Sequence, residues 1–115
     1  MRPRDPWTAL QDALAAGQAI ERFLIGRTLD QYVADEMLRS AVERQFEILG
    51  EALGRALRAD PTLSVRLSDA SAVIGFRNVL AQGYDAVADE TAYDLAQESL
   101  PVLRQRLGAL LEEAS

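Results

Sequence analysis

The segment Asp35–Ala59 constrains the fold most, because its apolar residues recur at steps of three and four along its whole length. The main stripe consists of Leu38, Val42, Phe46, Leu49, Leu53, Ala56 and Leu57. Such spacing places side chains on one side of an α-helix. Ala41, Ile48 and Ala52 widen the apolar arc. We therefore expect a long helix that contacts more than one neighbour.

A first helix is predicted over about residues 5–24, where Trp7 begins an apolar stripe at helical spacing. Gly26 should end this helix, and residues 28–33 are expected to form a short helical turn. Asp35 can then cap the long helix that follows, because its carboxylate can accept hydrogen bonds from the first amides.

Two more helices are predicted in the second half of the chain. One spans about residues 68–83, and residues 85–88 are expected to form a loop after it. Asp89 can then cap the last helix. Pro101 lies inside that helix, and we expect it to bend or split the helix because proline removes one backbone hydrogen bond.

The predicted fold is an all-α, up-and-down bundle of four main helices, since no segment shows the alternation that is typical of strands. A chain of 115 residues has the size of one domain, which we place at residues 1–115.

The charge composition limits how this chain can bind nucleic acid. All 12 basic residues are arginine, and 18 acidic residues give a net charge of −6. An acidic protein does not bind nucleic acid through bulk charge, so an RNA function requires a local arginine cluster. The chain has no cysteine and no histidine. Disulfides are therefore excluded, a metal would have to be bound by carboxylates, and no metal or cofactor is predicted.

No apolar run reaches the roughly 20 residues of a membrane-spanning helix. The N-terminal residues lack the apolar core of a signal peptide. We expect a soluble cytoplasmic protein that does not enter a membrane.

The end of the third predicted helix gathers polar side chains around one helix terminus. They are Arg77, Asn78, Gln82 and Tyr84, and Gly83 is the residue that breaks the helix. A binding or catalytic site is therefore expected there.

This segment resembles the signature of the HEPN superfamily, in particular of the HepT-like toxins. That signature is an arginine, a polar residue, three more positions, a histidine, one further residue and a tyrosine. Arg77, Asn78 and Tyr84 match it, and Gln82 stands where the histidine belongs. The run at residues 49–52 is also similar to an isoleucine-glycine-glutamate-alanine run in the family's second helix, with leucine in place of isoleucine.

The resemblance implies a metal-independent RNA endonuclease that acts as a two-fold homodimer, with the motifs of two subunits facing each other. Arg77 would bind the scissile phosphate of the RNA, and Asn78 would hydrogen-bond a phosphate or hold the loop. Gln82 can position a phosphate but cannot titrate, so cleavage should be attenuated or absent. A natural divergence and an introduced inactivation would look identical at Gln82.

The resemblance also implies a partner protein. HepT-like toxins are encoded beside a minimal nucleotidyltransferase antitoxin, in pairs of the HepT/MntA type, which resembles an enzyme that adds AMP to the motif tyrosine. Tyr84, which follows the flexible Gly83, would be the AMP acceptor. The structural alternative is that Tyr84 packs over the loop.

The long helix also carries a row of acidic residues at four-residue steps. They are Glu43, Glu47 and Glu51. Like charges at this spacing repel each other. Either arginines of the same helix relieve the repulsion on a solvated face, or Glu51 supports the site by orienting Arg77 from across the bundle. Gly50 and Gly54 are either tolerated glycines or a point of close backbone approach.

Three functional hypotheses follow. The leading one is a HepT-like toxin component whose ribonuclease site is weakened or inactive. The alternative is a non-catalytic helical module that binds a nucleotidyltransferase partner or a nucleotide. A plain dimerisation unit would explain the bundle, but it would leave the cluster around Arg77 without a role.

Overall fold

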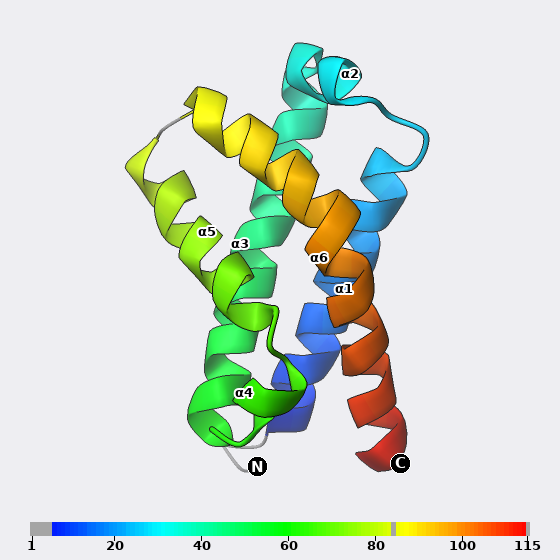
Figure 1. The fold of residues 1–115 in the computed structure, drawn as a ribbon, viewed down its shortest axis with the longest axis vertical. Helices are drawn as coiled ribbons and strands as arrows, with labels where there is room; N and C mark the ends of the chain where they lie inside the picture. Colours follow the sequence, from blue (N-terminus) through cyan, green and yellow to red (C-terminus); the bar gives the residue numbers. More distant parts are fainter. Residues whose placement is uncertain (1–5, 84, 115) are drawn as a thin grey trace.

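The protein is a helical bundle in which successive long helices run in alternating directions (Figure 1). The computed structural model describes residues 6–83 and 85–114, and these residues contain six helices and no strand. The helices are α1 (Pro6–Leu24), α2 (Leu29–Ala34), α3 (Glu36–Ala59), α4 (Leu63–Arg66), α5 (Ala70–Gln82) and α6 (Asp85–Ala114). The predicted all-α fold with four main helices is confirmed. None of these helices is long and apolar enough to cross a membrane.

The core forms where the apolar stripe of α3 meets those of α1, α5 and α6. The fully buried residues of α3 are Val42, Phe46, Leu49, Gly50, Ala52, Leu53 and Ala56. Most of the predicted stripe is in this set, Leu38 and Leu57 at its two ends are only partly buried, and the expectation of several neighbours is confirmed. Trp7 is 40% exposed, so its predicted place in the buried stripe of α1 is wrong. Its large ring lies in the first turn of the helix, and tryptophan is rarely covered completely.

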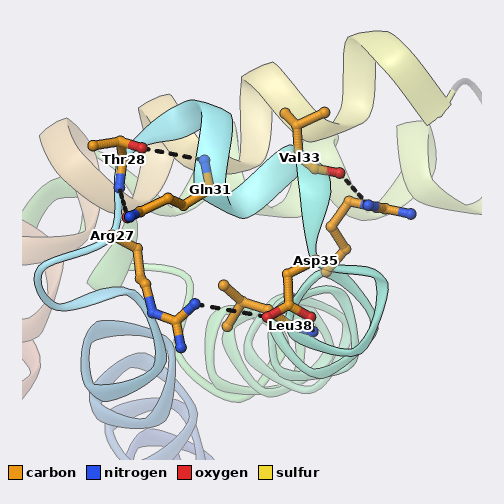
Figure 2. Close-up of polar contacts among 7 residues, drawn as sticks. Arg27, Thr28, Gln31, Val33, Asp35 and Leu38 are labelled. Carbon is orange, nitrogen blue, oxygen red and sulfur yellow. Dashed lines mark hydrogen bonds and ion pairs between the residues drawn. The ribbon is translucent and has the colours of Figure 1, made fainter.

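The connection between α1 and α3 is held by a series of polar contacts (Figure 2). Gly26 ends α1 with a φ of 73°, in the left-handed region that glycine adopts without strain. The Gln31 N–H donates to Thr28 Oγ1 at 3.1 Å, and the Thr28 N–H donates to Gln31 Oε1 at 2.9 Å. This reciprocal pair is a capping box that fixes the start of α2. The predicted short helical turn is therefore a capped helix.

Asp35 ends α2 and begins α3. The Leu38 N–H donates to Asp35 Oδ1 at 3.0 Å, which confirms the predicted cap, and the Arg27 guanidinium lies 3.6 Å from the other Asp35 oxygen (Figure 2). The Arg39 guanidinium donates to the Val33 carbonyl. These contacts join the end of α1, all of α2 and the first turn of α3.

Tyr32 is the apolar anchor of this connection, and sequence reasoning missed it. Its side chain is fully buried, and its ring lies 6.2 Å from that of Tyr93 on α6. The Tyr93 hydroxyl donates to the Arg27 carbonyl at 2.6 Å. The Tyr32 hydroxyl has no hydrogen-bond partner among the described residues. Burial and the charges of Glu43 and Asp89 raise the pKa of Tyr32, because both disfavour the phenolate.

The last helix starts at Asp85, so the predicted loop over residues 85–88 is wrong. Ala88 is buried and begins a row at four-residue steps with Ala92 and Ala96, which draws this part of the chain into the helix. Asp89 is therefore not the cap of α6. Its carboxylate lies 3.7 Å from Arg39 Nε of α3 and ties the two helices together.

Pro101 lies inside α6, which continues through it as one helix. Figure 1 shows that the two halves of α6 run in different directions. Of the two predicted outcomes, a bend or a split, the structure therefore shows the bend.

Candidate functional site

Arg77, Asn78 and Gln82 lie on α5, which packs against α3 at the edge of the bundle (Figure 1). Val73 and Phe76 are buried on the inner side of α5. The Phe76 ring meets Phe46 of α3 edge to face, with centroids 5.2 Å apart. Aromatic pairs in this geometry add to the stabilisation from burial. The inner side of α5 is thus fixed, and the outer side is left for other contacts.

Arg77 is exposed, and its aliphatic stem lies directly on the backbone of α3 at Gly50. A Cβ atom at residue 50 would lie 3.2 Å from both Cβ and Cδ of Arg77, and 3.6 Å from the Val73 carbonyl oxygen. Close backbone approach is therefore confirmed for Gly50. Among the described residues, a Cβ atom at Gly54 would meet only the guanidinium of Arg58 on the same helix, so Gly54 makes no close contact with another described helix.

The ion pair between Glu51 and Arg77 is not formed in the described part of the chain. Glu51 is exposed. Glu47 lies 3.9 Å from Arg44 of the same helix, and Arg55 pairs with Asp12 of α1 at 3.3 Å. An arginine of the same helix thus offsets the charge of Glu47, and no ion pair from Glu51 orients Arg77 among the residues whose side chains are described.

Asn78 and Gln82 are both exposed and lie one helical turn apart on the outer side of α5. Arg77 and Gln82 are separated by about 140° around the helix axis at 3.6 residues per turn. Arg77 borders α3, whereas Gln82 points away from it. The structure therefore brings Asn78 and Gln82 together but places Arg77 on a different side of the same helix.

Gly83 ends α5 in the left-handed conformation, with a φ of 74°, and its N–H donates to the Leu80 carbonyl at 3.2 Å. This confirms the predicted helix end. Tyr84, the predicted AMP acceptor, lies outside the described residues.

The chemistry available at this site is anion binding without a group that titrates near neutral pH. The carboxyl end of a helix carries partial negative charge, so the end of α5 by itself repels a phosphate. Arg77 supplies the positive charge, and none of its guanidinium N–H groups has a partner among the residues whose side chains are described. Asn78 and Gln82 can add neutral hydrogen bonds. The chain has no histidine or cysteine that could move a proton.

The fold and the site define a small all-α bundle that presents an arginine-centred polar motif near the end of its penultimate long helix. The family model described as Ribonuclease HepT-like matches residues 13–110. The chain therefore belongs to the HepT-like ribonuclease family of the HEPN superfamily. Neither the curated proteins nor the solved structures gave a match to this chain.

Sequence reasoning missed the contact between Gly50 and Arg77. The spacing of Gly50 and Gly54 indicated a close approach but not which element makes it. The pairing of α3 with α5 decides that, and helical periodicity does not encode the pairing.

Proposed function

We propose that this protein is the toxin component of a toxin–antitoxin pair, with a ribonuclease site attenuated by Gln82. The observation that carries the proposal is the exposed Arg77, which has no ion-pair partner in the described part of a HepT-like ribonuclease chain. A guanidinium whose donors are unused can bind the two free oxygens of an RNA phosphate at once.

The proposed loss of cleavage activity is attributed to Gln82. An amide donates and accepts hydrogen bonds, so Gln82 can hold a phosphate oxygen or a ribose hydroxyl beside Asn78. It cannot take a proton from the attacking 2′-hydroxyl. Loss of a general acid or base typically lowers the rate by about 10²- to 10⁴-fold. RNA binding should therefore persist while cleavage is slow or absent.

A homodimer would complete the site. Arg77 and Gln82 of one chain lie on different sides of α5, so these two side chains of a single chain do not reach the same phosphate. The outer side of α5 also exposes the small residues Ser71, Ala72 and Gly75, which allow another chain to approach closely. A two-fold contact would place both copies of Arg77 beside one cleft. Sedimentation at micromolar concentration should show a dimer, and a monomer alone would contradict this part of the proposal.

The proposed partner is a minimal nucleotidyltransferase antitoxin that transfers AMP to Tyr84. The hydroxyl oxygen of Tyr84 would attack the α-phosphate of ATP, pyrophosphate would leave, and the hydroxyl proton would pass to a base of the partner. The added phosphodiester carries a negative charge that could pair with Arg77 and block RNA. Co-expression with such a partner, followed by mass spectrometry, should give an AMP adduct that disappears in Tyr84→Phe. An unmodified Tyr84 beside an active partner would contradict the assignment.

A non-catalytic binding module is the second candidate, and the absence of histidine from the whole chain favours it. The two candidates separate in one experiment. Gln82→His should produce or strongly raise RNA cleavage in the presence of a metal chelator, and adding Arg77→Ala should abolish that gain. A folded Gln82→His protein that cleaves no RNA would leave the binding module as the function.

A further inference from the structure

A carboxylate paired with an arginine fixes the guanidinium in place but uses some of its N–H donors. Arg77 has no such carboxylate among the residues whose side chains the structure describes, which exclude residues 84–87. The aliphatic stem of Arg77 instead packs on the backbone of α3 at Gly50, which has no side chain. The aliphatic stem of an arginine can pack in this way while the guanidinium stays in water.

We propose that Gly50 is the positioning residue for Arg77: the missing side chain sets the direction of the Arg77 stem and leaves the guanidinium donors available for an RNA phosphate. This inference rests on the proposed function, because it assigns the phosphate to Arg77. It differs from the sequence expectation, in which Glu51 would orient Arg77 by charge.

The geometry makes the contact sensitive to a single methyl group. A Cβ atom at residue 50 would lie 3.2 Å from two Arg77 carbons, which is closer than carbon atoms normally approach. The Arg77 Cβ is fixed to the α5 backbone and cannot rotate away. Gly50→Ala must therefore move α5 away from α3 by a few tenths of an ångström, and the contact with Cδ also pushes the Arg77 stem out of its present path.

Gly54 offers a matched control on the same helix. Both glycine-to-alanine changes favour the helical state of α3 to the same degree. At Gly54, the new Cβ meets the end of the flexible Arg58 side chain, which can move at little cost. Gly54→Ala should therefore raise the unfolding midpoint and leave Arg77 undisturbed.

The test compares the native protein with Gly50→Ala and Gly54→Ala by RNA affinity and by the NMR order parameter of the Arg77 Nε–H group. We expect Gly50→Ala to weaken RNA binding about 10-fold, a partial loss of one charge-assisted contact, and to lower the order parameter. Gly54→Ala should leave the RNA affinity and the order parameter unchanged within experimental error. In the Gln82→His protein, Gly50→Ala should raise KM more than it lowers kcat.

Further variants test whether the effect passes through Arg77. In an Arg77→Ala protein, Gly50→Ala should weaken RNA binding no further. If Gly50→Ala does not fold, Gly50→Ala/Arg77→Ala, which lacks the Cδ atom, should fold better than the single variant. Equal instability of the two would overturn the inference.

The two proposals fail in different ways. A native protein that binds no RNA contradicts the proposed function, and the order parameter still tests the Gly50 contact. An Arg77 order parameter that Gly50→Ala leaves unchanged, or that Gly54→Ala lowers equally, would overturn the inference even if RNA binds.

Discussion

The segment from α1 to α3 and the end of α5 lie at the same end of the bundle, and they use their polar groups in opposite ways (Figure 1). In the connection from α1 to α3, Thr28 and Gln31 hydrogen-bond each other at the start of α2, and Asp35 accepts from the Leu38 N–H at the start of α3. Near the connection from α5 to α6, Arg77 has no ion-pair partner among the described residues, and Asn78 and Gln82 are exposed. The comparison teaches that the first connection uses its polar side chains to fix helix ends, while Asn78 and Gln82 of α5 remain exposed.

The largest expected effect is in the first connection. Tyr32→Ala should lower the free energy of unfolding by about 3–5 kcal/mol, because it removes a fully buried aromatic side chain. Tyr32→Phe is the matched control. It removes a hydroxyl without a hydrogen-bond partner, so stability should be unchanged or higher. Urea unfolding measures both, and a large loss in Tyr32→Phe would show that the hydroxyl is satisfied in solution.

Asp35→Ala should lower the free energy of unfolding by about 1–2 kcal/mol, because Asp35 caps α3. Asp69 stands at the same position before α5 but makes no side-chain cap. Asp69→Ala should therefore change stability by less than about 0.5 kcal/mol. Thermal unfolding measures the stability of both variants. Equal losses of stability would contradict the expected difference between the two aspartates.

Alkaline pH should weaken the first connection selectively. The pKa of Tyr32 is raised in the folded state, so the folded protein holds this proton at pH values where the unfolded chain has lost it. Stability is therefore fully present below pH of about 10 and falls above it, by at most about 1.4 kcal/mol per pH unit. No lysine, histidine or cysteine titrates in this range. Urea unfolding at several pH values should show the slope, and Tyr32→Phe should reduce it.

The smallest effects on stability are expected at the site. Asn78→Ala and Gln82→Ala should each change the free energy of unfolding by less than about 0.5 kcal/mol, because both side chains are exposed. The same variants should weaken RNA binding. A loss of stability comparable to that of Asp35→Ala would mean that these residues maintain the fold, and the contrast between the two connections would disappear.

Local sequence signals predicted much of the fold. The stripe of α3, its cap at Asp35 and the end of α5 at Gly83 follow from residues close together in the chain, and the structure has all three. The start of α6 was misplaced because aspartate at position 89 looks like a cap when its distant partner, Arg39, is unknown.

The site was only partly predictable for the same reason. The motif on α5 was found from its resemblance to the family signature, and its described members Arg77, Asn78 and Gln82 are exposed. The contact of Arg77 with Gly50, in place of an ion pair with Glu51, depends on how α3 and α5 pack against each other. Tyr32 was missed because a six-residue helix is too short to show a periodic stripe, although its ring is fully buried.

The most direct test of the account measures binding and cleavage of one labelled RNA side by side, for the native protein and for Gln82→His, without metal ions. The account predicts that both proteins bind the RNA with affinities within about threefold, since Arg77 is unchanged, and that only the histidine variant cleaves it at an appreciable rate. Rapid cleavage by the native protein, or loss of binding in both proteins, would contradict the central claim that this site binds phosphate but lacks a proton-transfer group.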